Sequence, residues 1–487
     1  CNVVAIIIII IIMDCALDSR CIELARAAGR LKLIAAHDAL ILLRASFSAP
    51  KLLHTLRSAP CAGHPALEKF DDQQRDCVSS ITNTDLSDLQ WIQASLPVKS
   101  GGLGIRRVAS LAPSAFLASA ASTHELQEQI LGRHHFLADA SVDTVLMFWT
   151  SRYNTPPPTD QLASQQRTWD KASIDYDVQK LTSNLQDAKD KARLLAVSAP
   201  HSGDWLHALP ITACGLRLDD EAVRVAVGLR LGCILCQPHI CPCGAQVDSR
   251  GTHGLACKRS AGRTVRHHQI NDVIWRALCH ANIPAVKEPT GLVRSDGKRP
   301  DGLTQIPWQG GKCLTWDVTV TDTLAASYVD LTAANAGAAA EGAASRKEEK
   351  YRALQDSHIF VPIALETLGP LNSKATVFLS DLGKRLSAVS NDVREGAQNA
   401  AVVHARADVQ HRRDADRVAD FLEALARVLE GRFGSEQSVL RAGDGVAARR
   451  NHEHIVLEQL LHHLDMARLV IHVGIRTADH ARRAAEL

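Results

Sequence analysis

The sequence is poor in aromatic residues and carries almost no net charge, and each shortage argues against a class of protein. Aromatic residues make up 4% of the 487 residues, so we expect no extensive surface for stacking nucleic-acid bases. The formal net charge is only +2, so any contact with nucleic acid must come from local basic patches. The length and the 46% hydrophobic content indicate an ordinary globular chain of roughly two to four domains.

The most apolar run of the sequence is too short to span a membrane. It contains the seven isoleucines Ile6 to Ile12, whereas a spanning helix needs about 20 apolar residues. No basic residue precedes the run, so it is also a poor signal peptide. We expect residues 1–25 to be a non-functional apolar leader, with a membrane anchor as the alternative, and the chain to be nuclear or cytoplasmic rather than secreted.

Dense apolar spacing predicts helices over residues 26–153. The pair Asp71-Asp72 lies in a helical pattern rather than on a hairpin, which favours solvated helix acids over a polymerase active site. Gly101, Gly102 and Gly104 lack GxGxxG spacing, so they predict a turn into a helix. We find no reverse-transcriptase catalytic motif.

A proline-rich break at residues 156–158 predicts a linker over residues 154–199. Residues 200–260 are expected to hold a helix and a metal-binding knuckle. The helix is predicted over Leu216 to Leu231, with Asp219 or Asp220 as its cap. Its buried face is predicted to consist of Ala222, Val223, Ala226, Val227 and Leu229.

Five of the 13 cysteines fall between Cys233 and Cys257, which is more typical of a metal site in a reducing compartment than of a disulfide framework. Zinc prefers four ligands such as thiolate and imidazole in a tetrahedron. Cys236 or His239 could replace one ligand, and a set of reduced core cysteines is the alternative interpretation. The pattern C-x-C-x9-H-x3-C predicts one structural zinc held by Cys241, Cys243, His253 and Cys257.

Two acidic residues are predicted to meet in a hairpin. CLTWDVTV, Cys313 to Val320, is a predicted buried strand with Asp317 at its centre. Asp301 follows a proline in KRPDG, and a Gly-Gly turn separates the two stretches. With a lysine from the following charged helix, which we expect to open at RKEEKYRAL (Arg346 to Leu354), two such acids can hold a divalent metal over a phosphate. Residues 358–369 predict another buried strand.

Together these motifs resemble the restriction-enzyme-like endonuclease of site-specific non-LTR retrotransposons, a form of the PD-(D/E)xK nuclease core. That domain follows a CCHC zinc knuckle and an Arg-His motif, and contains an RPD, an aspartate in a DVTV-like strand and a KxxKY helix. The stretch LPVKSGGLGIRR, with the LAPSAFLASA that follows, is similar to the thumb region of the same polyproteins. The matching positions, in the expected order, are Cys241 to Cys257, Arg266-His267, Arg299 to Asp301, Asp317 to Val320, and Lys347 to Tyr351.

The resemblance implies a catalytic Mg²⁺ held by Asp301 and Asp317, with Glu288 as a weaker third candidate. It implies DNA as the substrate and the RNA of the mobile element as a further partner. Thr319 stands where the simple PD-(D/E)xK pattern has lysine, so the catalytic lysine would come from the following helix. The two candidates are Lys347 and Lys350, of which we favour Lys350.

Basic side chains gather between the cysteine cluster and the acidic pair. They meet one acid there, Asp272, and form either a solvated helix face or a track for phosphates. Tyr351 either stacks in the site or packs in the core. We expect contacts to nucleic acid from Arg263, Arg266, His267, Arg276 and Arg299.

We therefore predict an α+β chain: a helical N-terminal region, a zinc knuckle with an α/β restriction-endonuclease-like core over residues 261–391, and a tail. The tail, residues 392–487, is expected to be helical or disordered and to offer a surface for helical self-association. The predicted function is Mg-dependent DNA nicking for target-primed retrotransposition. The alternatives are a non-catalytic nucleic-acid-binding remnant and a helical interaction protein.

Overall fold

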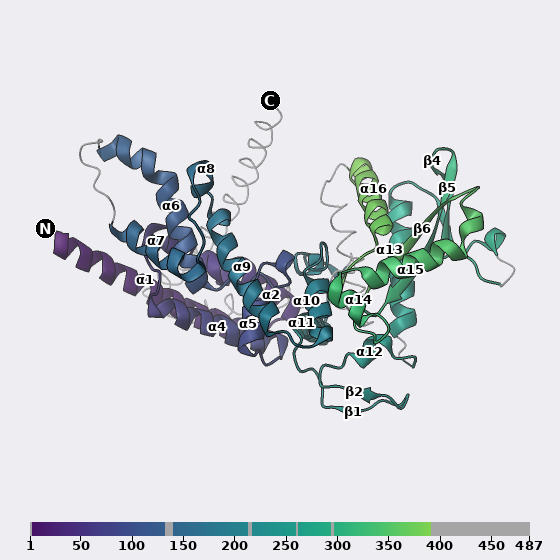
Figure 1. The fold of residues 1–487 in the computed structure, drawn as a ribbon, viewed down its shortest axis with the longest axis horizontal. Coiled ribbons are helices and arrows are strands. Elements are labelled where there is room, and N and C mark those ends of the chain that lie inside the picture. The colour runs from purple at the N-terminus through teal and green to yellow at the C-terminus, as the bar shows by residue number, and fades with distance from the viewer. Residues whose placement is uncertain (1, 132–139, 213–216, 260–261, 294–296, 391–487) are drawn as a thin grey trace, which may run out of the picture. The chain divides into compact units, whose positions relative to one another are not determined.

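The chain has an α+β architecture with a helical N-terminal part, which confirms the predicted fold class (Figure 1). A computed structural model describes residues 2–131, 140–212, 217–259, 262–293 and 297–390. No helix within these ranges combines the length and the apolarity needed to cross a bilayer. The expectations for residues 392–487, including self-association, lie outside the described residues.

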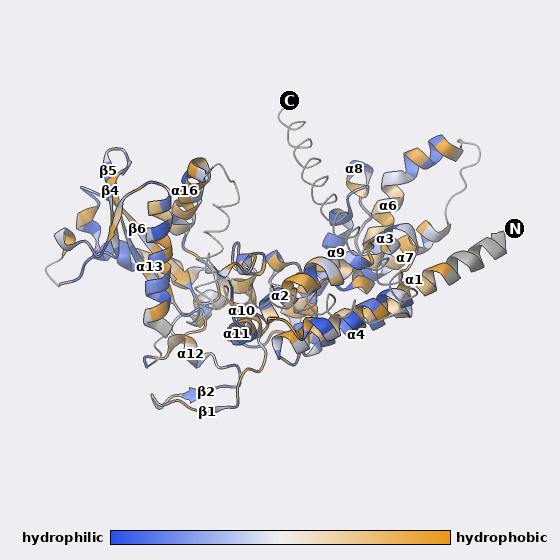
Figure 2. Cartoon of the chain, turned by 180° about the vertical axis from the view of Figure 1, so that it is seen from behind, coloured by the Kyte–Doolittle hydropathy of each residue, from blue (hydrophilic) through white to orange (hydrophobic). Residues whose placement is uncertain are grey.

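The N-terminal part packs its helices around an apolar core that includes Leu24, Leu40, Phe70 and Val223. Hydrophobic and hydrophilic residues alternate around these helices (Figure 2). The helices are α1 (Asn2–Leu31), α2 (Ala36–Leu42), α3 (Leu53–Ser58), α4 (Pro65–Thr82), α5 (Asp88–Ala94), α6 (Val108–Leu131), α7 (Ala140–Tyr153), α8 (Asp160–Ala163), α9 (Gln166–Asn184), α10 (Ala188–Val197) and α11 (Asp220–Leu231). A π-helical segment spans Leu43–Phe47, and 3-10 turns span Ala49–Lys51, Val98–Ser100 and Asp204–Leu206.

Several local predictions for this part are confirmed. Asp219 caps α11 by accepting a hydrogen bond from the amide of Ala222 at 2.7 Å, and the five predicted face residues of α11 are buried. The three glycines lie in the turn before α6, where Gly101 and Gly104 have positive φ.

Two segments differ from the sequence-based expectation. α1 passes without a break through residue 25, and Leu17 and Leu24 of the expected leader are buried in the core. The expected linker contains α8, α9 and α10. The buried stripe of α9 has a four-residue spacing but includes two polar residues, so its hydrophobic periodicity is weak. The stripe consists of Trp169, Ser173, Asp177 and Leu181.

Asp71 is not a solvated acid, and this expectation is corrected. It is 2% exposed and accepts hydrogen bonds from the amides of Val108 at 2.7 Å and Ala109 at 3.1 Å, at the start of α6. Burial raises the pKa of Asp71 to about 7, although these amides and Arg107 lower it. Asp72, the next residue, is exposed as expected. The sequence pattern around both acids is helical in either case, so it does not distinguish them.

We expect Asp71 to make the chain less stable as the pH rises from about 4 to 7. In this range the unfolded carboxyl has lost its proton while the folded one still holds it, so raising the pH favours unfolding. The slope contributed is at most about 1.4 kcal/mol per pH unit. Denaturant unfolding at several pH values should show a steeper fall for the wild-type chain than for Asp71→Asn. Equal slopes would refute this assignment.

The C-terminal part is a four-stranded mixed sheet of order β3-β4-β5-β6, with helices on both faces (Figure 1). β3 and β4 pair antiparallel, as do β4 and β5, whereas β5 and β6 pair parallel. The elements are α13 (Gly262–His280), β3 (Ala285–Lys287), β4 (Gly302–Gln309), β5 (Lys312–Thr321), α14 (Val329–Ala334), α15 (Ala338–Lys350), β6 (Ile359–Glu366) and α16 (Ser373–Ser390). In the sequence, two small elements connect the N-terminal part to the C-terminal part. They are the hairpin of β1 (His239–Ile240) and β2 (Gln246–Val247), and the short helix α12 (His253–Ala256).

The predicted hairpin and both predicted strands are confirmed. Gly310 and Gly311 connect β4 to β5 with φ values of 57° and 75°, which glycine adopts without strain. At the other end, Gly302 lies under Trp316, because a Cβ on Gly302 would come within 2.0 Å of the indole. A larger residue at position 302 would therefore push β4 away from β5.

The side chains of β5 alternate between two helical layers. Leu314, Trp316 and Val318 share a core with α13 and α16, and the residues between them point to the other face. That other face is covered by α15, whose Ala340, Ala343 and Ala344 pack against Ala364 of β6. Asp317 therefore projects on the side of α15.

The charged helix was predicted to begin at Arg346, and this prediction is wrong. α15 begins at Ala338 and ends at Lys350, so the charged residues form its last turns. Gly337, in the left-handed conformation, precedes the first turn, and alanine has the highest helix propensity of all residues. The small alanine side chains also let α15 approach the sheet closely.

Candidate functional site

Asp301 lies beside the part of β5 that carries Asp317. The ladder pairs Gly302 with Trp316, and the amide of Asp301 donates to the carbonyl of Trp316 at 2.9 Å. Asp301 immediately precedes β4, and its partners Trp316 and Val318 are the two neighbours of Asp317 in β5. The amide of Val318 donates to Asp301 Oδ2 at 2.6 Å and fixes the orientation of that carboxylate. The structure thus places Asp301 beside the segment of β5 that carries Asp317.

His267 of α13 contacts Asp301. Its Nε2 lies 3.0 Å from Asp301 Oδ2. This hydrogen bond raises the pKa of His267 above its ordinary value. Burial lowers the pKa, but the negative charge of Asp301 adds to the rise. His267 is therefore tied to a carboxylate, rather than lying on an open surface for phosphates.

Of the two candidate lysines, Lys347 makes the closer contact. Its Nζ lies 2.5 Å from Asp317 Oδ1, whereas Nζ of Lys350 lies 3.9 Å from Asp317 Oδ2. Lys350 also donates to the hydroxyl of Tyr351 at 2.7 Å. One helical turn separates the two lysines, so both ammonium groups reach the same buried carboxylate.

The side chain of Tyr351 packs in the core of the C-terminal part. The side chain is buried, its hydroxyl donates to the carbonyl of Arg299 at 2.8 Å, and its ring lies 4.9 Å from that of Phe360. Arg299 forms an ion pair with Glu288, whose φ is positive. Glu288 is thus engaged outside the acidic pair, which does not support it as a third metal ligand.

The expected nucleic-acid-binding residues divide into three groups. Arg276 is exposed on α13, and Arg299 is partly exposed. Arg266 is only 4% exposed, and its guanidinium donates to the carbonyl of Leu255 at 2.6 Å, so it does not present a surface for phosphates and this expectation is corrected. The side chain of Arg263 lies outside the described residues.

The four predicted zinc ligands converge. Their donor atoms all lie within 4.8 Å of one another. Sγ of Cys241 lies 3.7 Å from Sγ of Cys257, and Sγ of Cys243 lies 3.2 Å from Nε2 of His253. Three thiolates and one imidazole at these distances form a cluster that can hold a zinc ion.

The two alternative ligands lie outside this cluster. Cys236 Sγ donates to the carbonyl of Asp248 at 3.3 Å, and His239 Nδ1 lies 2.9 Å from the carbonyl of Gln237.

A hydrogen bond from the amide of Ala245, together with the neighbouring thiols, lowers the pKa of Cys243, which favours the thiolate that a metal requires.

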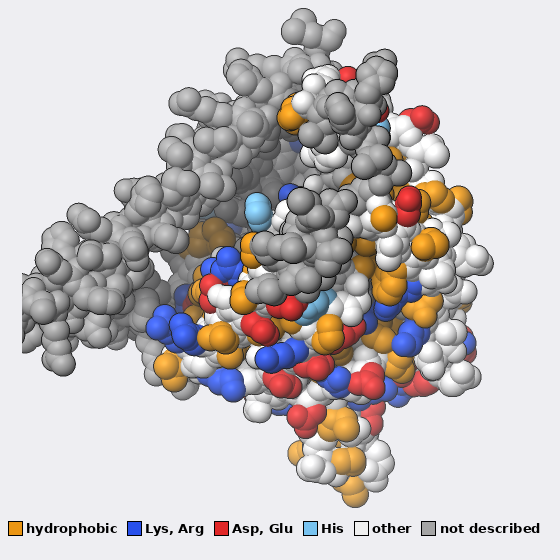
Figure 3. All heavy atoms as spheres, turned by 90° about the vertical axis from the view of Figure 1, so that its left-hand side faces the viewer, with side chains coloured by type: hydrophobic (Ala, Val, Ile, Leu, Met, Phe, Trp, Pro, Cys, Tyr) orange, Lys and Arg blue, Asp and Glu red, His pale blue; other side chains and the backbone are white. Residues whose placement is uncertain are grey.

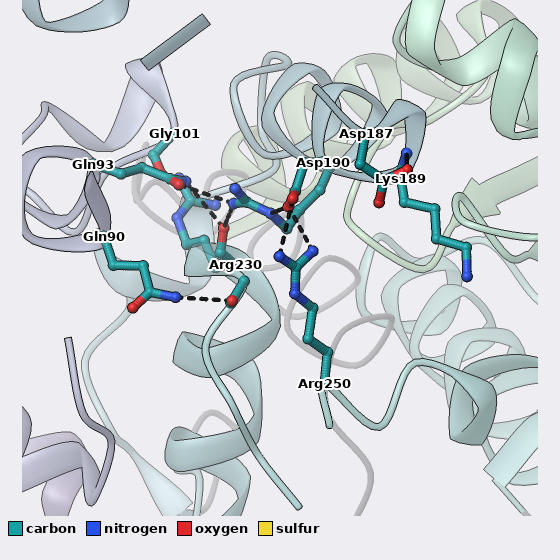
Figure 4. A network of polar contacts seen from close by, with 10 residues as sticks. Gln90, Gln93, Gly101, Asp187, Lys189, Asp190, Arg230 and Arg250 are labelled. Atoms are coloured by element: carbon teal, nitrogen blue, oxygen red, sulfur yellow. Dashed lines mark hydrogen bonds and ion pairs between the residues drawn. The ribbon is translucent and has the colours of Figure 1, made fainter. Parts of the chain in front are cut away.

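An ion-pair network anchors the cysteine cluster to the N-terminal part (Figure 4). Arg250 precedes the metal-ligand helix α12 and forms two hydrogen bonds to Asp190 of α10, at 2.7 and 2.9 Å. Arg193 lies on the same carboxylate at 3.2 Å and donates to Gln93 at 2.9 Å. Burial opposes ionisation of Asp190, but both arginines hold its pKa below the ordinary value.

Two residues that support the sites were not predicted from the sequence. Asn271 accepts a hydrogen bond from the indole of Trp316 at 2.8 Å and donates to the carbonyl of Asp301 at 3.4 Å. Asp190 anchors Arg250 from 60 positions away. No local pattern marks either residue, because each has its partner only after distant segments pack.

The face of the molecule drawn in Figure 3 shows acidic and basic side chains of the described residues interspersed, as the near-neutral charge suggests. Comparison with models of protein families gave no match, and comparison with curated proteins gave none either.

Proposed function

We propose that the chain is a metal-dependent DNA endonuclease that nicks a target strand, as the restriction-enzyme-like domain of non-LTR retrotransposons does. One observation carries the proposal: Asp301 is hydrogen-bonded to both neighbours of Asp317 in β5, and Lys347 contacts Asp317. The motifs of the resemblance therefore meet in space, although Lys347 follows Asp301 by 46 positions in the sequence.

The acidic pair has the donor chemistry that Mg²⁺ prefers. Mg²⁺ in phosphoryl-transfer sites is held by one or two carboxylates together with waters and substrate phosphates. Asp301 and Asp317 supply two carboxylates, which are 16% and 4% exposed. When bound, such an ion polarises the phosphate and lowers the pKa of a water molecule.

The neighbouring side chains would orient the reacting groups. The Val318 amide and His267 fix the carboxylate of Asp301. Lys347 is 25% exposed, so its ammonium can move from Asp317 to a phosphate oxygen when DNA is bound. There it would stabilise negative charge that develops during cleavage.

The full-length chain, incubated with supercoiled plasmid, tests this proposal. We expect nicked circles with Mg²⁺ and no product with EDTA. Ca²⁺, which has the same charge but a more flexible coordination, should support binding without efficient cleavage. Plasmid that stays supercoiled under all metal conditions would contradict the proposal.

The structure favours Lys347 over Lys350 as the residue that acts at the phosphate. We expect Lys347→Ala to slow nicking on the order of 100-fold and Lys350→Ala to slow it much less. Single-turnover rates on a nicking substrate measure both effects. Lys384→Ala, at an exposed position of α16, is the matched control and should cut like the wild type. A larger loss in Lys350→Ala would reverse the assignment.

We further propose that the cysteine cluster binds one zinc ion that stabilises the fold and does not take part in cleavage. Thiolate ligands suit a structural tetrahedral site, whereas the carboxylate pair suits Mg²⁺. Arg250 and its partner Asp190 would then hold the zinc-bound knuckle beside the helical part.

A second candidate is a nucleic-acid-binding protein that does not cleave. It is favoured by the internal contacts of the two acids, since Asp317 forms an ion pair with Lys347 and Asp301 is hydrogen-bonded to His267. Retained DNA binding without nicking would support this candidate. Both candidates predict that Arg276→Gln weakens DNA binding, because both use exposed basic residues for phosphates.

A further inference from the structure

Arg266 connects α13 to the metal-ligand helix. Its guanidinium is buried and donates to the carbonyl oxygen of Leu255 at 2.6 Å. Leu255 belongs to α12, which begins at His253 and is followed directly by Cys257. The acceptor of this hydrogen bond is thus flanked on both sides by candidate zinc ligands.

The next residue of α13 contacts the acidic pair. His267 lies 3.0 Å from Asp301 Oδ2, the same oxygen that accepts the hydrogen bond from the Val318 amide. Two consecutive residues of one helix therefore bind two different sites. A displacement of Arg266 would move His267 with it, because both belong to the same turn of α13.

Arg266 also acts on the end of β5. Burial raises the pKa of Asp322, and the positive charge of Arg266 opposes that rise. Asp322 follows β5 directly, and Asp317 lies near the middle of that strand. The guanidinium therefore donates to α12 and lies within electrostatic range of the chain segment that extends the strand of Asp317.

We propose that Arg266 is a positioning residue that couples metal binding at the cysteine cluster to the placement of Asp301. The inference rests on the proposed function only for the role of Asp301 as a catalytic ligand. Its geometric part is the chain of contacts from Leu255 through Arg266 and His267 to Asp301.

The coupling follows from the low intrinsic stability of the short helix α12. A helix of four residues has no stability of its own, so the ion that joins His253 to Cys257 would fix its backbone. Without the ion, the carbonyl of Leu255 is no longer held at its place. The buried guanidinium of Arg266 then loses its hydrogen bond to Leu255, and α13, which is no longer held to α12 by that bond, shifts.

Hydrogen exchange at the Val318 amide tests the coupling in the full-length chain, since this amide donates to Asp301. In the wild type, removing zinc with a chelator should raise its exchange rate about tenfold, which corresponds to one lost hydrogen bond. Arg266→Gln should exchange at the faster rate even with zinc bound, as verified by metal analysis, and a chelator should add little. His280→Gln, at an exposed position of the same helix, should behave like the wild type.

Two outcomes would overturn the proposal: Val318 exchange that ignores the chelator in the wild type, or a chelator effect of equal size in Arg266→Gln. If Arg266→Gln does not fold, Arg266→Lys decides instead, because it keeps the charge and one donor and should show a reduced chelator effect. Absence of DNA cleavage in all variants would contradict the proposed function, while the exchange data would still decide the coupling.

Discussion

Replacing either Asp301 or Asp317 with asparagine is expected to abolish metal-dependent cleavage while DNA binding persists. Each substitution removes one anionic oxygen ligand, which weakens both ion binding and the activation of water. The loss of rate should exceed the roughly 10- to 100-fold typical of residues that only support a metal ligand. Nicking rates and DNA affinity, measured on the same preparations, separate the two effects.

Folding must be measured beside activity, because Asp317 is buried and paired with Lys347. Breaking a fully buried pair costs about 3–5 kcal/mol, but the partial exposure of Lys347 allows water to reach its ammonium and reduces that cost. Asp381→Asn, which removes a half-exposed carboxylate from α16, is the matched control and should keep full activity. A folded Asp317→Asn chain that cuts at the wild-type rate would refute the catalytic assignment.

Loss of the metal from the cysteine cluster is expected to have the second large effect. We expect one zinc per chain, and Cys257→Ala should lose it and unfold at a lower temperature. Structural zinc contributes roughly 10 to 16 kcal/mol of apparent binding free energy in small zinc peptides, and part of that energy stabilises the fold here. Metal analysis and thermal unfolding with and without a chelator measure both consequences.

Cys236→Ala provides the control for this experiment. Cys236 lies close to the cluster but donates to the carbonyl of Asp248, so its variant should retain one zinc and respond to the chelator like the wild type. Zinc loss from Cys236→Ala would instead identify Cys236 as a ligand. A chelator that leaves the unfolding temperature of the wild type unchanged would contradict a structural role for the metal.

The parts of the site that depend on local chain geometry could be predicted from sequence. Gly310 and Gly311 predict a tight turn, and the strand pattern around Asp317 then brings this part of β5 beside Asp301. The cysteine cluster could also be predicted from the sequence, since its four ligands lie within 17 residues, Cys241 to Cys257, at spacings suited to one small ion.

The parts that depend on packing could not be predicted. The choice between Lys347 and Lys350 depends on where α15 begins, which is set by Gly337 and by close packing of alanines on β6. Asp71 and Arg266 have ionisable side chains, so their sequence context suggested solvent exposure. Both are buried because distant backbone groups provide hydrogen bonds: the amides of α6 for Asp71 and a carbonyl of α12 for Arg266.

The most direct test of the central claim is Mn²⁺ binding to the full-length, zinc-loaded chain, followed by electron paramagnetic resonance. The account predicts a site that binds Mn²⁺ in the wild type and in Asp381→Asn, and that is lost or strongly weakened in Asp301→Asn and Asp317→Asn. Mg²⁺ should displace the ion. Equal Mn²⁺ binding by all four folded proteins, or none by the wild type, would contradict the assignment of Asp301 and Asp317 as one divalent-cation site.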